Sequence, residues 1–267
     1  MTGTGVPTLL GACYDASSSF LRGPAEAPAA IRRELESPAS NAWSEGLVEV
    51  VRGAVWDDAG DVSLGDAPRE AIERGVETLL SQGRRPFVLG GDHSITYPVV
   101  CAVRRHHPRL TILHLDAHND LYHEFEGDSH SHACPFARIM EAGLADQLVQ
   151  VGVRAMTRHQ REQADRFGVE VIDMRRWTAG ERFTLRHPVY VSLDVDVLDP
   201  AYAPGVSHRE PGGMTVREVV GLVQGIEQPI VGADLVEYNP RRDLDTVTAT
   251  VCAKLVKELL AAMHLRP

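Results

Sequence analysis

The sequence has few cysteines and no long apolar run. Its four cysteines, Cys13, Cys101, Cys134 and Cys252, form no CxxC pair and no framework like those of small secreted domains. We therefore expect isolated reduced thiols. No window reaches the roughly 18 apolar residues of a membrane-spanning helix, and no basic segment precedes the short apolar stretch near the N-terminus. These absences lead us to expect a cytoplasmic protein.

Positive charge is also scarce. The chain has 27 Lys and Arg residues against 37 Asp and Glu residues, a formal net charge of -10. This balance opposes binding to nucleic acid or to an anionic membrane surface, and it favours a small or cationic partner. The 267 residues contain no linker-like tract, repeat or low-complexity segment, so we expect a single domain over residues 1–267.

Short apolar runs alternate with stretches of helical period along the chain. Five runs have the length and β-branched content of buried strands: residues 86–90, 110–115, 147–151, 188–193 and 229–236. Such alternation is typical of a mostly parallel sheet with both faces covered by helices. The fold class expected is therefore α/β, a three-layer α/β/α sandwich with a mostly parallel central sheet.

Two helices have clear sequence signals. The first has apolar residues at helical spacing from Ile72 to Leu80, with Asp66 expected as its N-cap and Gly83 as its C-cap. The second follows Asp243 and is expected to bury one stripe, formed by Leu244, Val247, Val251 and Leu255.

Potential metal ligands follow four of the predicted strands, where the ligand crevice of a parallel sheet lies. The tight turn Gly-Gly-Asp-His-Ser at 90–94 delivers His93 to the start of a helix. Extended backbone after the second strand would place Asp116, His118 and Asp120 on one side. The last two strands are followed by Asp194 with Asp196, and by Glu237.

So many carboxylates at buried strand ends require a counter-charge, and these segments contain no comparable number of Lys or Arg residues. Four aspartates with two neutral imidazoles carry a charge of about -4, which two divalent cations would balance. Oxygen-rich ligands with two histidines and no cysteine favour Mn²⁺ over Zn²⁺ or an iron-sulfur cluster. The pattern therefore predicts a two-metal hydrolase.

The motifs Gly-Gly-Asp-His, Asp-Ala-His-Asn-Asp and Ser-Leu-Asp-Val-Asp-Val-Leu-Asp-Pro, in this order, resemble the signatures of the ureohydrolase family. This family contains arginase, agmatinase, guanidinobutyrase and formiminoglutamase. The resemblance covers nearly the whole chain and implies an arginase-like fold with two Mn²⁺ ions per chain. One ion would be held by His93, Asp116, Asp120 and Asp194, and the other by Asp116, His118, Asp194 and Asp196.

The resemblance also implies how a guanidino group would be hydrolysed. Glu237 would hold the guanidinium, and Asp120 would hydrogen-bond a bridging hydroxide. His132 would contact the substrate and protonate the leaving amine, with His130 as the competing candidate for that role. The other histidines that match no motif, His208 among them, are expected to be surface or packing residues.

Two segments favour agmatinases within the family. Residues 131–141 and 209–215 resemble agmatinases more than arginases, and residues 152–157 contain no carboxylate for the α-amino group of L-arginine. We therefore expect hydrolysis of agmatine to putrescine and urea. Arg209, near the expected mouth of the site, could bind a carboxylate tail, so 4-guanidinobutanoate is an alternative substrate. Arginase and formiminoglutamase activities also remain alternatives.

Two further hypotheses differ in class or chemistry. One is a catalytically inactive, metal-binding regulatory protein, although all six metal ligands, His132 and Glu237 are present. The other is a single-zinc deacetylase of the same layered fold, for which the second aspartate pair and His93 would have no use. The family resemblance also implies a homo-oligomer, a trimer or a hexamer.

Overall fold

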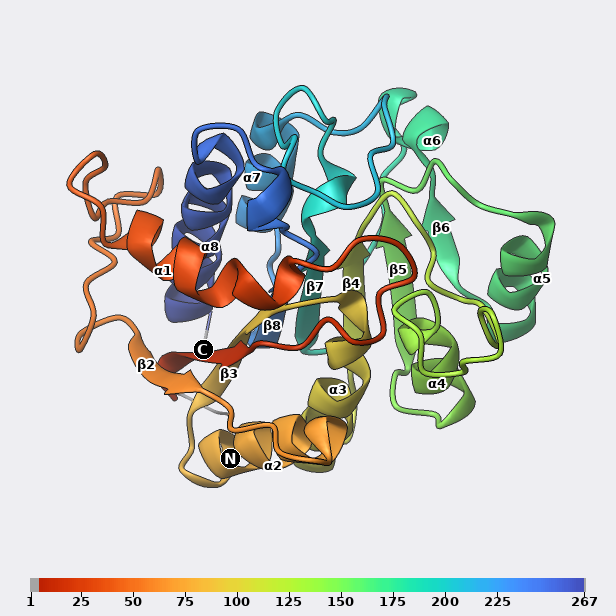
Figure 1. Cartoon of the computed structure of the whole chain (residues 1–267), viewed down its shortest axis with the longest axis horizontal. Coiled ribbons are helices and arrows are strands. Elements are labelled where there is room, and N and C mark those ends of the chain that lie inside the picture. The colour runs from red at the N-terminus through yellow and green to blue at the C-terminus, as the bar shows by residue number, and fades with distance from the viewer. Residues whose placement is uncertain (1–4, 267) are drawn as a thin grey trace.

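The computed structural model describes residues 5–266 and is built on one eight-stranded sheet, shown in Figure 1. The strands lie in the order β2-β1-β3-β8-β7-β4-β5-β6, and neighbouring strands are parallel. Their bounds are β1 Pro7–Ala12, β2 Asp57–Asp61, β3 Arg85–Gly90, β4 Thr111–Leu115, β5 Gln147–Val151, β6 Glu170–Ile172, β7 Val189–Asp194 and β8 Ile230–Val236. The five predicted strands are confirmed, with shifts of one residue at some ends.

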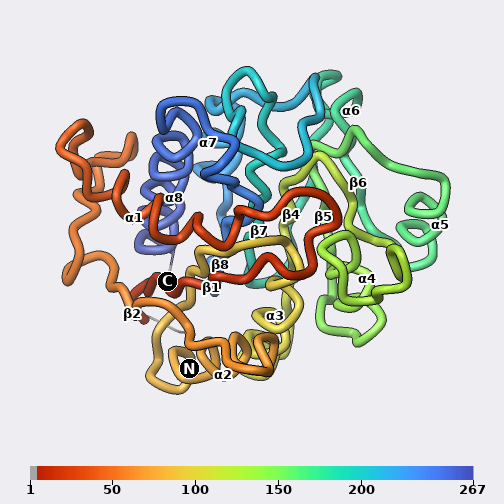
Figure 2. The backbone as a smooth tube through the Cα atoms, viewed as in Figure 1, coloured from red at the N-terminus to blue at the C-terminus, as the bar shows by residue number. Residues whose placement is uncertain are grey.

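Helices cover both faces of the sheet, as Figures 1 and 2 show. One layer contains α1 (Ala27–Leu35), α7 (Val216–Gln224), α8 (Val247–Leu265) and the short α6 (Met174–Thr178). The other contains α2 (Pro68–Ser81), α3 (Thr96–His106), α4 (Pro135–Glu141) and α5 (Arg158–Phe167). The expected three-layer α/β/α sandwich is confirmed.

The central strands explain why the sequence shows continuous apolar runs. Every residue of β3, β4, β7 and β8 is buried, because helices shield both faces of these strands. Short 3₁₀ helices follow several strands: η1 (Pro24–Glu26), η2 (His93–Ile95), η3 (Val195–Val197) and η4 (Pro240–Arg242). The turns that lead into η2 and η3 are the ones that present polar residues at the carboxyl edge of the sheet.

The start of α2 differs from the prediction. Its N-cap is Ala67, which has no capping side chain, and Pro68 takes the first helical position. Asp66 therefore lies one residue too early to act as the N-cap. Gly83 follows the C-cap Gln82 in a left-handed conformation with φ of 73°, which agrees with the predicted helix end.

The predicted stripe of α8 is wrong. Leu244 lies before the helix and is 63% exposed, and Val247 is 46% exposed. The buried residues are instead distributed around most of the helix, because α1 and α7 pack against it as well as the sheet. Asp243 still supports the helix start, since its carboxylate accepts hydrogen bonds from the backbone N–H groups of Thr248 and Ala249.

Membrane-spanning helices and disulfide bonds are the two features that the sequence led us not to expect. Within residues 5–266, no helix has the length and hydropathy that a bilayer-crossing segment requires. The four cysteines are free thiols, as expected.

Candidate active site

The carboxyl ends of four adjacent strands bring the predicted site residues together. Strands β3, β8, β7 and β4 are neighbours in the sheet, so the segments that follow them meet at one edge. The residues gathered there are His93, Asp116, His118, Asp120, His132, Asp194, Asp196 and Glu237.

The first part of the site is a ring of carboxylates around the imidazole of His93. Its Nδ1 atom lies 3.2 Å from Oδ2 of Asp116, 3.1 Å from Oδ2 of Asp120 and 3.2 Å from Oδ2 of Asp194. His93 is fully buried, and its Nδ1 has no hydrogen-bond partner among the described residues. A buried nitrogen that faces three carboxylate oxygens in this way is a suitable ligand set for a cation.

The other ring nitrogen of His93 acts as a hydrogen-bond donor. Nε2 lies 3.0 Å from the hydroxyl of Ser192, and that hydroxyl donates its proton to Asp234 at 2.7 Å. The hydroxyl must therefore accept from Nε2–H, so Nδ1 is the atom that a neutral His93 would offer to a cation. Burial disfavours the charged ring, but the Asp116, Asp120 and Asp194 carboxylates prevail and raise the pKa of His93 well above its usual value. The sequence analysis did not identify Ser192 or Asp234, because their role depends on pairing between β7 and β8.

A second set of ligands lies beside the first. Nδ1 of His118 is 3.0 Å from Oδ2 of Asp196 and 3.4 Å from Oδ1 of Asp116. Asp116 thus directs one oxygen toward each set. The Oδ1 atom of Asp194 accepts a 2.7 Å hydrogen bond from the backbone N–H of Asp196, which ties the two sets together.

His114 is a site residue that the sequence analysis missed. Its Nε2 lies 2.8 Å from Oδ2 of Asp116, and its Nδ1 accepts a 3.0 Å hydrogen bond from the side chain of Gln150. His114 therefore donates to Asp116 and fixes the orientation of that carboxylate. The available signal was its position two residues before Asp116, near the end of the same strand.

The backbone conformation of this region differs from the extended one we expected. Strand β4 ends at Leu115, and Asp120 adopts a left-handed conformation with φ of 48°. Asp196 lies in η3 rather than in a strand. The side chains converge because the loops turn back on themselves: the backbone N–H of His118 donates to Asp116, and that of Ala117 donates to Asp196.

The electrostatics of the site favour a bound cation. Burial and the nearby Asp196 and Asp116 carboxylates raise the pKa of Asp194 well above its usual value. Burial and Asp116 likewise raise the pKa of Asp196 to about 6. Divalent cations would relieve the repulsion among these acids, and Nδ1 of His93, once deprotonated, would give one of them a nitrogen ligand.

A histidine–glutamate pair adjoins the ligand sets. Nδ1 of His132 lies 2.8 Å from Oε1 of Glu237, and both residues are nearly buried. Burial disfavours the charged imidazole, but the Glu237 carboxylate prevails and raises the pKa of His132 to about 9. The alternative candidate, His130, lies elsewhere: its ring contacts Tyr97 and hydrogen-bonds to Ser129.

The pair and part of the ligand sets open into a cavity of about 180 Å³. The cavity wall includes Asp120, Asp194, Asp196, His118, His132 and Glu237, together with Ser19, Tyr122, Phe125, Ala133, Ala155, Gln160 and His208. His208 corrects our expectation of a packing residue, because its ring centroid lies 5.3 Å from that of His132 and 6.0 Å from that of His118. No motif in the sequence marked it.

Arg209 does not support recognition of a carboxylate tail. Its guanidinium donates to the backbone oxygens of Pro204 and Arg242, at 2.9 and 3.2 Å, and it does not line the cavity. The position of this side chain therefore does not support 4-guanidinobutanoate as the substrate.

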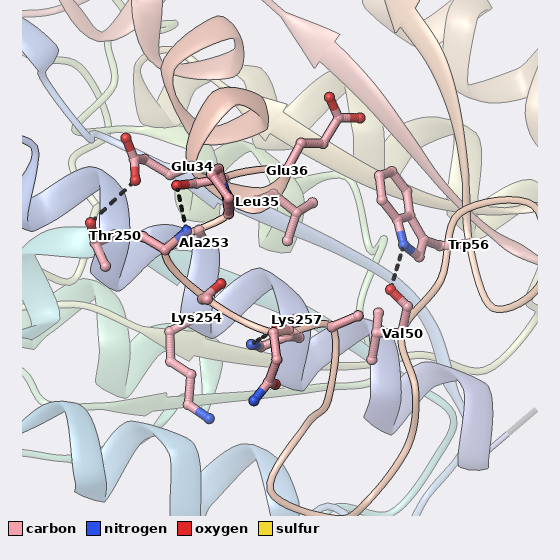
Figure 3. A pocket seen from close by; sticks show the side chains of 15 residues that line it. Glu34, Leu35, Glu36, Val50, Trp56, Thr250, Ala253, Lys254 and Lys257 are labelled. Carbon is pink, nitrogen blue, oxygen red and sulfur yellow. Dashed lines mark hydrogen bonds between the residues drawn. The ribbon is translucent and has the colours of Figure 1, made fainter.

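A larger cavity of about 620 Å³ lies away from these residues, between α1, α8 and the segment that carries Trp56 (Figure 3). It contains Lys254 and Lys257, the only lysines in the sequence. Lys257 donates to the backbone oxygen of Asn41, and Lys254 pairs with Glu258. None of the predicted site residues lines this cavity, so the chemistry belongs to the smaller one.

Comparison with known proteins agrees with this geometry. A family profile described as "Arginase family" matches residues 7–262. "Arginase 1, mitochondrial" of Arabidopsis thaliana is 45% identical over 95% of this chain and 80% of its own length. "Agmatinase" of Bacillus anthracis is 35% identical over 76% of this chain and 73% of its own length. The solved arginase from Medicago truncatula superposes with a TM-score of 0.92 at 44% identity, covering 97% of this chain and 88% of that one.

The same comparison contradicts the expected cytoplasmic location. Several relatives that match about 95% of this chain are named as mitochondrial proteins. The expectation came from cysteine spacing and the lack of long apolar runs, features that exclude disulfide frameworks and membrane spans but do not distinguish one aqueous compartment from another.

Proposed function

The chain belongs to the arginase family, and from that premise we propose that it hydrolyses the guanidino group of L-arginine to give L-ornithine and urea. The observation that carries the reaction class is the shared cavity, in which the ligand sets around Asp116 lie beside the His132–Glu237 pair. An acid–base pair next to a carboxylate-rich metal site is the arrangement that metal-assisted hydrolysis requires.

The choice of L-arginine over agmatine rests on two observations. Identity to the relative named arginase is 45% over nearly the whole chain, against 35% over three quarters of it for the relative named agmatinase. The cavity also offers the amide group of Gln160, whose Oε1 is occupied by Thr157, so its N–H₂ can donate to an α-carboxylate. Agmatine has no such carboxylate.

Agmatine remains the second candidate because of one specific feature. The segment 152–157 contains no acid, and its only residue in the cavity wall is Ala155. This segment therefore provides no carboxylate for the α-amino group of an amino acid, which was one of the grounds for our expectation of agmatine.

We propose that two Mn²⁺ ions occupy the ligand sets. His93, Asp116, Asp120 and Asp194 would hold one ion, and Asp116, His118, Asp194 and Asp196 the other. The donors fit such ions, because they are mostly carboxylate oxygens and the buried Nδ1 of His93 has no hydrogen-bond partner. When bound, the pair of ions would make a nucleophilic hydroxide available from water near neutral pH.

Within this proposal, Glu237 orients the substrate. Its buried carboxylate would form a charge-assisted pair with the guanidinium, which holds the guanidino carbon in place for attack. Asp120 would accept a hydrogen bond from the attacking oxygen, since its carboxylate lies in both the first ligand set and the cavity wall.

His132 supplies the proton that the leaving group needs. The amine of ornithine leaves the tetrahedral intermediate only as a neutral molecule, and Glu237 stabilises the charged form of His132 that can provide this proton. His132 is buried and forms part of the cavity wall, so its ring lies near a substrate held in the cavity.

A urea-release screen of the Mn²⁺-loaded protein tests the proposal. The substrates are L-arginine, agmatine, 4-guanidinobutanoate and N-formimino-L-glutamate, with ammonia and formamide followed in parallel. We expect the highest kcat/KM with L-arginine. A higher kcat/KM with agmatine would show that agmatine, rather than L-arginine, is the substrate. No turnover by a protein that retains its metal would support the regulatory alternative. Light scattering in the same preparation tests the expected trimer or hexamer.

A further inference from the structure

The imidazole of His132 has a second partner that the reaction described above does not use. Its Nε2 atom lies 2.7 Å from Oγ of Ser19 and 3.2 Å from the backbone nitrogen of the same residue. Since Nδ1 is bonded to Glu237, both ring nitrogens are engaged. Ser19, His132 and Glu237 thus form one continuous chain of hydrogen bonds from the rim of the cavity to its buried wall.

The donors and acceptors in this chain define the state of the imidazole. A backbone N–H group can only donate, so the contact from Ser19 requires Nε2 of His132 to accept. The Glu237 carboxylate accepts on the other side, which places the ring proton on Nδ1. The backbone contact from Ser19 thus favours a neutral imidazole, whereas the carboxylate of Glu237 favours the charged one.

The hydroxyl of Ser19 can hydrogen-bond to Nε2 in both protonation states of His132. It donates to Nε2 when His132 is neutral, and it accepts from Nε2–H when His132 is charged. The backbone N–H of Ser19 has no such freedom and favours the neutral form alone. Together they allow His132 to hold a proton and to release it readily.

The position of Ser19 suits transfer between His132 and a substrate. Ser19 is exposed and lines the cavity, whereas His132 is only 8% exposed. The Ser19 hydroxyl therefore occupies the position from which a leaving amine would otherwise hydrogen-bond to Nε2.

The loop that carries Ser19 is anchored independently of His132. The fully buried carboxylate of Asp92 accepts a 2.9 Å hydrogen bond from the backbone N–H of Ser17 and a 3.3 Å bond from the hydroxyl of Ser18. Asp92 directly precedes His93, so the loop is attached to the same turn that presents the first metal ligand.

We propose that Ser19 is a proton relay between His132 and the leaving amine, an inference that rests on the proposed function. In this step the Oγ–H bond breaks as the new N–H bond forms on the leaving nitrogen. The proton on Nε2 passes to Oγ at the same time, and the electron pair of the breaking C–N bond stays with the amine. The net change is one proton moved from the imidazolium to the amine, with Ser19 unchanged.

Three variants test the relay. Ser19→Ala removes the hydroxyl, Ser19→Thr retains it, and Ser129→Ala is the matched control, because Ser129 also contacts a histidine, His130, but lies outside the cavity wall. We expect Ser19→Ala to lower kcat by about 10- to 100-fold with little change in KM, on the scale of general acid–base contributions. Ser19→Thr should recover most of the rate, and Ser129→Ala should match the wild type.

A proton inventory separates a relay from a structural role. Under single-turnover conditions, the rate of the wild type should depend non-linearly on the deuterium fraction of the solvent, because two protons move together. The rate of Ser19→Ala should depend on it linearly. A linear dependence in the wild type, or a Ser19→Ala rate within about twofold of the wild type, would overturn the relay.

Nitrogen-15 spectra of the histidine rings keep the test independent of turnover. In protein loaded with a diamagnetic divalent cation, we expect the Nε2 resonance of His132 to shift in Ser19→Ala, because the hydroxyl that contacts this atom is removed. An unchanged resonance would refute the contact between Ser19 and His132. Absence of turnover with every substrate would instead refute the proposed function, while these spectra would still report on the contact.

Discussion

The Oε1 atom of Glu237 accepts hydrogen bonds from both His132 and His93, from the ring Nδ1 of the former at 2.8 Å and from the backbone N–H of the latter at 2.9 Å. One carboxylate oxygen thereby joins the His132–Glu237 pair to the turn that presents His93, a proposed metal ligand. Glu237 adopts a left-handed conformation with φ of 65°, which is uncommon for a residue other than glycine and is found often at functional sites.

Glu237→Gln removes the charge of this carboxylate and keeps its shape. The amide oxygen can still accept from the backbone of His93, so both metal ions should be retained. We expect kcat to fall about 100- to 1,000-fold, the scale seen when one preorganised electrostatic contact is lost. Metal analysis and steady-state kinetics check this, with Glu227→Gln as a control on the exposed surface. Loss of metal from Glu237→Gln would make Glu237 a structural or ligand residue.

Metal stoichiometry tests the two ligand sets separately. Asp196 contacts His118 and has no contact with Nδ1 of His93, so Asp196→Ala should reduce two bound Mn²⁺ ions per chain to one. The control is Asp165→Ala on the exposed side of α5. Chelation of both ions should lower the free energy of unfolding by about 3 kcal/mol for each ion present at about 100 times its dissociation constant. A single ion in the fully active wild type would contradict the two-ion site.

The pH dependence of turnover should have two limbs. Asp196, with a pKa of about 6, must lose its proton to bind a cation, so activity should rise as pH increases through about 6. His132, with a pKa of about 9, is charged below that pH and can donate a proton, so kcat should fall as pH increases through about 9. His132→Asn should lower kcat and lack the second limb. A maximum near pH 5, or a second limb that persists in His132→Asn, would contradict these roles.

The sequence predicted the parts of the fold and site that depend on local pattern. Continuous apolar runs identified β3, β4 and β7, because central parallel strands are buried on both faces. The exposed β2 and the three-residue β6 have no such pattern. Short motifs at strand ends likewise named the residues that the structure brings together, although their backbone is not extended.

The contacts that the sequence did not reveal join segments that are distant in the chain. Ser192 contacts Nε2 of His93 and donates to Asp234 on the adjacent strand, and Ser19 reaches His132 across 113 positions. Each of these residue types is common in loops and strands, so its role appears only when the sheet order places it beside its partner.

The turn before His93 offers a test of how closely the site depends on packing. The backbone N–H of Gly91 donates to the oxygen of Ala12, and its own oxygen accepts from the backbone of Glu237 at 2.9 Å. A Cβ atom on Gly91 would lie only 1.8 Å from the backbone oxygen of Tyr14, which cannot move as a side chain can.

Gly91→Ala should therefore destabilise the protein by about 1–3 kcal/mol, the usual cost of overpacking, and should weaken metal binding because the turn carries His93. Gly221→Ala provides the matched control: a Cβ there meets no atom within 4 Å, and Gly221 lies within α7, so alanine should stabilise the helix by about 1 kcal/mol. Urea unfolding and metal analysis measure both effects. If Gly91→Ala unfolds at the wild-type urea concentration and keeps both ions, the site tolerates displacement of this turn, and the close packing around Gly91 does not position His93.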